Sequence, residues 1–258
     1  MKELKTLRGL ALLPLYDWPE LHHLTDGVWT CIRTAARDEG LDLPAELDHR
    51  AQQVSAWMAD DVVFSQLCGS PWYRKHRHHA RYLATSDFEL SDNGPGQYYS
   101  KIVVAAESPF SELEQLGAAR LAYNDEDSQS GVHCLRPLMD VEAHLARGLE
   151  SGGHRFSMQA VAAGEADFAA IDAFSFKLAD SVAPALTAGL RVIAQTPERP
   201  APVLITSTAF DDDTAQRLQR AVLMGLENLP EGIAAPYSFR GAVNLGSAAY
   251  AIFSPTGR

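Results

Sequence analysis

Short apolar runs alternate with longer segments of helical period along most of this chain, and this alternation constrains the fold more than any other feature. The clearest helical segment extends from Trp18 to about Glu39, where Leu24, Val28 and Ile32 recur at spacings of four. Strands that alternate with helices are typical of α/β proteins with mostly parallel sheets. The expected strands cover residues 6–15, 61–66, 82–85, 98–106, 120–123, 168–171, 190–194 and 203–207.

Further helices are expected between these strands. A helix is predicted over residues 133–149, because Leu135, Leu138, Val141 and Leu145 follow the helical period there. Three aspartates at the start of another expected helix, over residues 211–229, suit the positive end of its dipole. Other helices are expected over residues 157–163 and from 173 onward, and a short one is indicated by Val54, Trp57 and Met58.

Composition excludes several classes of protein. The chain has 258 residues, enough for one large domain or two smaller ones. Lys and Arg number 22 against 33 Asp and Glu, and the resulting net charge of −11 argues against a nucleic-acid partner. No apolar run reaches about 18 residues, so no insertion into a membrane is expected. Three scattered cysteines and the absence of nucleotide-loop or zinc-protease motifs predict neither a metal nor a cofactor.

The N-terminus has some features of a targeting segment, with Lys2, Lys5 and Arg8 ahead of an apolar run. Pro14 ends that run after a few residues, and no small-x-small cleavage site follows. We therefore interpret residues 6–15 as the first buried strand and expect a cytoplasmic location. A periplasmic location is the alternative if a leader is missing from the sequence.

Ligands of open α/β sheets bind beyond the carboxyl ends of the strands, so the polar residues at those ends are the candidates for a binding site. The most informative of them lie in the loop 124–131, where Ser128 and Ser130 precede the helix expected from His133. Their hydroxyls and the first N–H groups of that helix could hold an anion, and Gly131 would let it approach the backbone. The alternative is an ordinary N-cap, which accounts for both serines.

Three segments resemble the phosphate/phosphite/phosphonate-binding family of ABC-transporter solute-binding proteins. The loop Asp125-Glu126-Asp127-Ser128-Gln129-Ser130-Gly131 is similar to the family's D-x-x-S-x-S-G turn. The segment 160–172, AVAAGEADFAAID, is similar to its "AV..G.AD.AA.D" pattern, and 192–197, VIAQTP, is similar to the "VIA.S..IP" crossover. The three segments occur in the family order and together span about residues 99–205.

This resemblance implies a two-lobed type 2 periplasmic-binding-protein fold with a ligand cleft between the lobes. Lobe one would comprise residues 1–100 and 200–258, and lobe two residues 101–199. The family pattern then implies that an oxyanion is held by Ser128, Gln129, Ser130 and Gly131. Other site residues implied by the resemblance are Tyr16, Ser65, Gln66, a tyrosine at the first crossover (Tyr98 or Tyr99), and Asp172 facing a substrate amine.

The chain departs from the family pattern in ways that bear on the ligand. Gln129 replaces the small hydroxyl residue that is usual between the two serines. Asp17, beside Tyr16, and Asp172 would place negative charge near the anion, which favours a zwitterion such as an aminoalkylphosphonate. As an alternative, Asp17 only caps the helix that begins at Trp18.

We therefore expect a protein that captures a small oxyanion, a phosphonate or phosphate ester, by closure of two lobes and delivers it to an ABC permease. One alternative is an enzyme on the same fold, for which Cys68 and His133 are the candidate catalytic residues. Another is a cytosolic ligand sensor or carrier.

Overall fold

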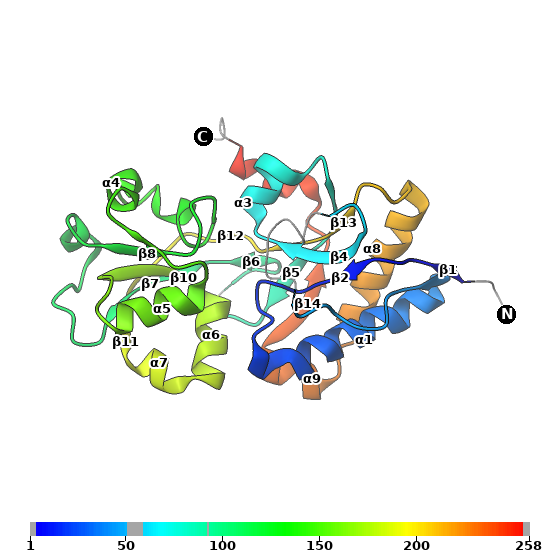
Figure 1. Cartoon of the computed structure of the whole chain (residues 1–258), viewed down its shortest axis with the longest axis horizontal. Helices are drawn as coiled ribbons and strands as arrows, with labels where there is room; N and C mark the ends of the chain where they lie inside the picture. The colour runs from blue at the N-terminus through cyan, green and yellow to red at the C-terminus, as the bar shows by residue number, and fades with distance from the viewer. Residues whose placement is uncertain (1–3, 51–58, 92, 255–258) are drawn as a thin grey trace. The chain divides into compact units, whose positions relative to one another are not determined.

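A computed structural model describes residues 4–50, 59–91 and 93–254 (Figure 1). The chain forms two compact units. Unit 1 consists of Met1–Glu89 and Pro200–Arg258, and unit 2 of Leu90–Arg199. The short helix expected at Val54, Trp57 and Met58 lies outside the described residues. In the described part of the chain, no helix has the length and apolar character needed to cross a bilayer.

Unit 1 is built on a five-stranded sheet with the order β14-β5-β13-β4-β2. Only β2 and β4 run parallel in it, whereas β4–β13, β13–β5 and β5–β14 are antiparallel. The strands are β2 (Leu10–Ala11), β4 (Val62–Leu67), β5 (Ala80–Phe88), β13 (Val203–Ser207) and β14 (Phe239–Val243), with β1 (Lys5–Thr6) and β3 (Leu41–Asp42) as a separate parallel pair.

Two long helices of unit 1, α1 (His22–Asp38) and α8 (Asp212–Glu227), pack side by side (Figure 1, blue and orange). Gly225 makes this close approach possible, because a side chain there would meet the backbone of Cys31 and Ile32. The carboxylate of Asp211 caps α8 by accepting from the Thr214 N–H at 2.7 Å. The shorter elements are η1 (Pro19–Leu21), α3 (Gly69–Pro71), η2 (Trp72–His76), α9 (Glu231–Tyr237) and η5 (Ser247–Phe253).

Unit 2 also contains a five-stranded sheet, with the order β11-β7-β10-β8-β9. β10 runs parallel to β8 and antiparallel to β7. The strands are β7 (Ser100–Ala105), β8 (Leu121–Tyr123), β9 (Leu149–Glu150), β10 (Phe168–Asp172) and β11 (Leu190–Gln195), and β6 (Gln97–Tyr98) pairs with β12 (Arg199–Pro200). The helices are η3 (Leu113–Leu116), η4 (His133–Leu135), α4 (Val141–Leu145), α5 (His154–Ala162), α6 (Ala173–Val182) and α7 (Pro184–Ala188).

Both sheets are mixed, so the expectation of mostly parallel sheets was wrong. Strand–helix alternation predicts parallel neighbours only where a helix returns the chain to the same end of the sheet. β13 enters the sheet of unit 1 after the chain has passed through unit 2, and it lies antiparallel to both β4 and β5. The α/β class itself is confirmed, because helices flank both sheets.

Two predicted elements are interrupted in the structure. The strand expected over 6–15 is split into β1 and β2, because Gly9 has a positive φ of 139° and lies against the backbone of Asp61. The helix expected over 133–149 is also wrong. Pro137 has no N–H to continue it, so the short helix η4 ends there and Asp140 starts α4 as its N-cap. The chain then ends this segment in the strand β9.

Candidate functional site

The sheet of unit 2 brings together a serine, a histidine and a carboxylate that are far apart in the sequence. Ser130 follows β8, His154 is the first residue of α5, and Asp172 ends β10. The Ser130 Oγ lies 2.8 Å from the His154 Nε2, and that same nitrogen lies 3.2 Å from the Asp172 Oδ2. Because β8 and β10 are parallel neighbours, their carboxyl ends meet at one edge of the sheet, as the sequence predicts for a binding site.

The environment of His154 keeps its ring neutral in the ligand-free protein. Burial lowers the pKa of His154, and this effect outweighs the opposing influence of the Asp172 carboxylate and a backbone hydrogen bond with Ala170. A neutral imidazole has one N–H and one lone pair. With the proton on Nε2 the ring is a donor at this contact, and with the proton on Nδ1 the Nε2 lone pair accepts from the Ser130 hydroxyl.

Asp172 is buried, and its two carboxylate oxygens differ, because Oδ1 accepts a hydrogen bond whereas Oδ2 makes no hydrogen bond among the described residues. Oδ1 accepts from the Ser175 N–H at 2.8 Å and caps α6, while Oδ2 faces His154. The carboxylate therefore fixes the start of a helix and the orientation of the imidazole.

This arrangement differs from the triad of a serine hydrolase. In such a triad, one ring nitrogen contacts the serine and the other contacts the carboxylate, which lets the ring pass a proton. Here Nε2 contacts both Ser130 and Asp172. The geometry orients the Ser130 hydroxyl and provides no route for proton relay through the ring.

The loop that precedes η4 is a compact turn with internal hydrogen bonds. Ser128 Oγ accepts from the Gly131 N–H at 3.0 Å, and the Ser128 carbonyl accepts from the N–H groups of Val132 and His133. Ser128 thus closes the turn, but it is not the predicted N-cap, because the N-cap of η4 is Val132 and has no side-chain hydrogen bond. Because η4 is a single short turn, the long helix expected after this loop is wrong, and an anion site in the loop stays a prediction.

Gly131 is needed for packing within this loop. A Cβ atom at this position would overlap the side-chain oxygen of Asn124. Gly131 therefore permits a close approach between two parts of the loop, and its contact with a ligand stays a prediction.

The backbone carbonyl of Ser130 accepts from two side chains, whereas that of Ser128 accepts from two backbone N–H groups. Ser100 Oγ donates to the Ser130 carbonyl at 2.8 Å and the Cys134 thiol donates to it at 3.0 Å. No acceptor for the Ser130 backbone N–H occurs among the described residues. This N–H belongs to the preceding peptide, whose Gln129 carbonyl accepts from the Cys134 N–H at 2.8 Å. The fixed N–H and the adjacent hydroxyl can together donate two hydrogen bonds to one oxyanion.

A shallow recess opens on unit 2 beside Ser130. It brings together the buried Tyr98, Tyr99 and Gln129, which the sequence singled out, with the cationic side chain of Arg199. The Tyr99 hydroxyl lies 3.4 Å from Ser91, so this tyrosine is tied to its own unit. The other residues that line the recess are Ser100, Ser130, Cys134, Thr196 and Pro197.

The remaining predicted residues belong to unit 1. Tyr16 and Asp17 follow β2, and Ser65 and Gln66 lie in the neighbouring parallel strand β4. All four are buried. Ser65 Oγ and Gln66 Oε1 have no hydrogen-bond partner among the described residues, although the Gln66 amide donates to Ser86 at 2.9 Å. Unpaired buried polar atoms are costly and are found where a ligand or water completes the hydrogen bonding.

Asp17 does not cap the following helix. That helix begins after Trp18 and has no side-chain cap, whereas the Asp17 carboxylate accepts from Thr25 and contacts His49, both at 2.6 Å. The two residues proposed for an enzyme belong to different units. Cys68 lies in unit 1, and the Nδ1 of His133 accepts from Arg136 at 2.9 Å.

Sequence reasoning missed His154, Ser100 and Arg199. His154 stands six residues before the Ala160-Val161 motif and directly after Gly152-Gly153. Gly153 is the N-cap of α5, and glycine marks the start of a helix less clearly than serine does. Ser100 was hidden within an apolar strand. Only the folded sheet brings these residues to Ser130.

Comparison with known proteins gives one family and several similar folds. The model of a family described as "ABC transporter, phosphonate, periplasmic substrate-binding protein" matches residues 47–244. No curated protein sequence matches significantly.

Three similar structures cover nearly the whole chain. XAC2383 from Xanthomonas citri, bound to ATP, has 18% identity and a TM-score of 0.65, over 95% of this chain and 97% of that one. A binding-protein component of an ABC phosphonate transporter from Pseudomonas aeruginosa has 16% identity and a TM-score of 0.69, with coverage of 93% and 82%. PhnD1 from Prochlorococcus marinus, in complex with methylphosphonate, has 16% identity and a TM-score of 0.66, with coverage of 96% and 94%. The fold is that of the type 2 periplasmic-binding proteins, as the sequence predicted.

Proposed function

The chain belongs to the family of periplasmic substrate-binding proteins of ABC phosphonate transporters, and from this premise we propose that it captures a small phosphonate or phosphate ester at Ser130. The observation that carries the proposal is the 2.8 Å contact between Ser130 Oγ and His154 Nε2. It presents a hydroxyl and an imidazole side by side, next to a backbone N–H. Hydrogen bonds to a charged acceptor are about twice as strong as neutral ones.

Membership of this family confirms a binding protein over the alternative of an enzyme. The function is thus selection and delivery of a ligand without bond breaking. Arg199, at the recess beside Ser130, supplies positive charge for an anion. Long-range attraction to the whole protein is not available, since the net charge is −11.

The organic group of the ligand is proposed to be uncharged. Asp172 and Asp17 were expected to favour a zwitterion, but each carboxylate already has internal partners, Ser175 and His154 for Asp172, and Thr25 and His49 for Asp17. For Asp17, hydrogen bonds to both oxygens satisfy the buried carboxylate and leave little gain from a ligand amine. For Asp172, Oδ1 is taken by Ser175 and Oδ2 has only the 3.2 Å contact with His154. PhnD1, with a similar fold, was crystallised with methylphosphonate.

We propose further that the two units correspond to the two ligand-binding lobes, so that Tyr16, Ser65 and Gln66 of unit 1 contact the same ligand. The family description places these proteins in the periplasm. It therefore gives no support to the expected cytoplasmic location and agrees with the alternative. Delivery to the permease of an ABC transporter follows from the same family role and remains a proposal for this chain.

A thermal-shift screen tests the proposed ligand class. The panel contains methylphosphonate, 2-aminoethylphosphonate, phosphate, phosphite and sulfate. A ligand that binds only the folded state raises the unfolding midpoint by mass action. The proposal predicts a rise with methylphosphonate at least as large as that with 2-aminoethylphosphonate. Loss of the rise in Ser130→Ala, but not in the matched surface variant Ser181→Ala, would place the ligand at Ser130.

Two results would contradict the proposal. No shift with any phosphonate or phosphate would remove the ligand class. A shift that is the same in Ser130→Ala as in the wild type would leave the class standing but move the site away from Ser130.

A further inference from the structure

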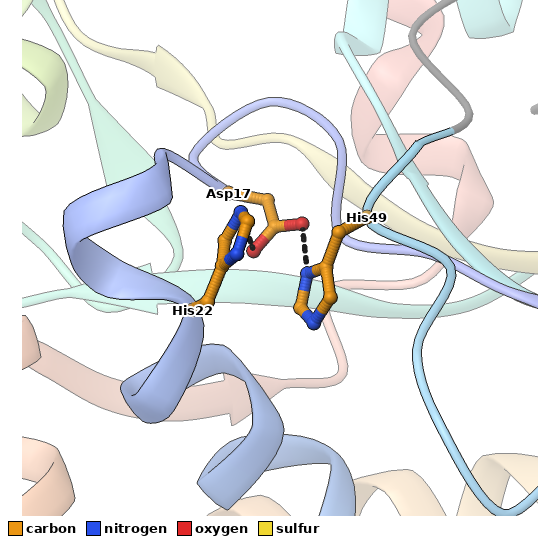
Figure 2. A group of neighbouring side chains, drawn as sticks. All are labelled: Asp17, His22 and His49. Carbon is orange, nitrogen blue, oxygen red and sulfur yellow. Dashed lines mark hydrogen bonds and ion pairs between the residues drawn. The ribbon is translucent and has the colours of Figure 1, made fainter.

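Unit 1 contains a second group of chemically active side chains, remote in sequence from the Ser130 loop. Asp17 lies between β2 and η1, His22 is the first residue of α1, and His49 follows β3. Figure 2 shows both imidazoles beside the Asp17 carboxylate. One donor atom from each residue lies within 4.8 Å of the other two.

The spacing of these donors is close to that of a metal site. His49 Nδ1 lies 2.6 Å from Asp17 Oδ2, and His22 Nε2 lies 3.9 Å from Asp17 Oδ1. Ligand atoms at 2.0–2.1 Å from a tetrahedral ion are roughly 3.3 Å apart. Both distances therefore reach the required value with shifts of less than about 1 Å.

The side chains differ in their freedom to make those shifts. Asp17 is buried, whereas the His22 side chain is 34% exposed. The imidazoles of His22 and His49 are stacked with centroids 4.0 Å apart. Its exposure makes the His22 ring the side chain that would move when an ion binds.

The residues behind the donors fit the same interpretation. The Thr25 hydroxyl lies 2.6 Å from Asp17 Oδ1, and the Nε2 of His49 lies 3.1 Å from Asp26 Oδ1. Histidines that bind metals commonly donate their second N–H to a carboxylate, which fixes the ring and its tautomer. Here Asp26 would hold the proton of His49 on Nε2 and leave Nδ1 as the donor atom that faces Asp17.

We propose that Asp17, His22 and His49 form a binding site for a divalent first-row transition-metal ion. Imidazole and carboxylate ligands suit Zn²⁺, and three protein ligands leave a fourth position for water or another donor. The carboxylates of Asp17 and Asp26 compensate the charge of the ion. The bound ion would join the segment after β2, the start of α1 and the segment after β3. The inference is independent of the proposed phosphonate site, because no residue is shared with the Ser130 group.

The test uses untagged, metal-free protein titrated with Co²⁺ and followed by visible absorption, with Zn²⁺ added in competition. The site predicts one ion per chain and ligand-field bands of a low-coordinate Co²⁺ that Zn²⁺ removes. His22→Ala is the decisive variant, because this side chain is partly exposed and its loss leaves the Asp17–His49 contact in place. Its affinity for the ion is expected to fall at least tenfold.

Matched controls separate this site from scattered surface histidines. His23 is the exposed neighbour of His22 on the same helix, so His23→Ala should bind the ion as the wild type does. A variant with alanine at His76, His78 and His79 should also keep the bands. Asp26→Asn keeps all three ligands and should weaken binding about 10- to 100-fold through the orientation of His49.

The proposal is overturned if the wild type shows no Co²⁺ bands. It is also overturned if His22→Ala binds as tightly as His23→Ala, or if the triple alanine variant alone abolishes binding. None of these results affects the phosphonate proposal, which is tested with Ser130 variants.

Discussion

His154 Nε2 lies 2.8 Å from Ser130 Oγ, across 24 positions of the sequence. The contact ties the start of α5 to the loop after β8, so the hydroxyl is oriented before any ligand arrives. Preorganised donors lose less conformational entropy when they bind. The loop at Ser130 is further fixed through its carbonyl, which accepts from Ser100 and Cys134.

The buried His154 predicts a pH dependence of stability. Burial lowers its pKa below the ordinary value of 6.5 in the folded protein. The unfolded chain therefore binds a proton at pH values where the folded protein does not, and stability rises with pH. The contribution of His154 to the free energy of unfolding is fully present above its pKa in the unfolded chain, about 6.5. It is lost as the pH falls through the lower pKa that His154 has in the folded protein.

Urea unfolding at pH 7.5 and 5.5 measures this effect. One group can contribute at most about 1.4 kcal/mol per pH unit. The free energy of unfolding of the wild type should decrease more between these two values than that of His154→Gln. Equal decreases in both proteins would mean that His154 takes up its proton readily in the folded state.

Ser65 offers a test of the residues predicted in unit 1. Its hydroxyl is buried and has no partner among the described residues. Ser65→Ala should therefore stabilise the ligand-free protein by up to about 1 kcal/mol, since an unpaired polar group is removed. If Ser65 contacts the ligand, the same variant should bind methylphosphonate more weakly.

Ser207 in the same sheet is the matched control. It is also buried, but its Oγ accepts from the Ala209 N–H at 3.1 Å. Ser207→Ala should thus lower the unfolding midpoint while leaving ligand affinity unchanged. Destabilisation by both variants in thermal unfolding would show that the Ser65 hydroxyl is paired in solution.

Close packing of α1 against α8 predicts opposite effects of alanine at two helical glycines. A Cβ at Gly225 would lie 2.8 Å from backbone atoms of Cys31 and Ile32, which cannot move independently. Overpacking of this kind costs about 1–3 kcal/mol.

At Gly232 in α9 a Cβ meets nothing within 4 Å. There alanine should stabilise by up to about 1 kcal/mol through its higher helix propensity. Chemical denaturation measures the change in the free energy of unfolding for each variant. Equal changes in the two variants would refute the close contact between α1 and α8 at Gly225.

The fold could be predicted where the local pattern decides it. The apolar stripe of α1 and the aspartate cap of α8 are local, and both helices form within a few residues of the predicted positions. Strand direction depends on the route of the chain between strands, and β13 returns from unit 2 with the opposite direction to its neighbours. Pro137 ended the predicted helix because its missing N–H outweighs a favourable apolar period.

The candidate site was predictable only where its residues stand close together in the sequence. Ser128 and Ser130 stand in one short motif, and their loop position could be recognised from the sequence. Their roles diverge only in three dimensions, where Ser128 closes the turn and Ser130 meets His154. The Asp17–His22–His49 group was not visible either, since 32 positions separate Asp17 from His49.

Calorimetric titration of the purified protein with methylphosphonate tests the central claim most directly, with Ser130→Ala and Ser181→Ala measured alongside. Loss of one hydrogen bond to a charged ligand corresponds to about 1.5–3 kcal/mol, or roughly a 10- to 100-fold weaker affinity. We predict one site per chain in the wild type and in Ser181→Ala, and a weakening of this size in Ser130→Ala. Unchanged affinity in Ser130→Ala, or no heat of binding in the wild type, would contradict the assignment of an oxyanion to Ser130.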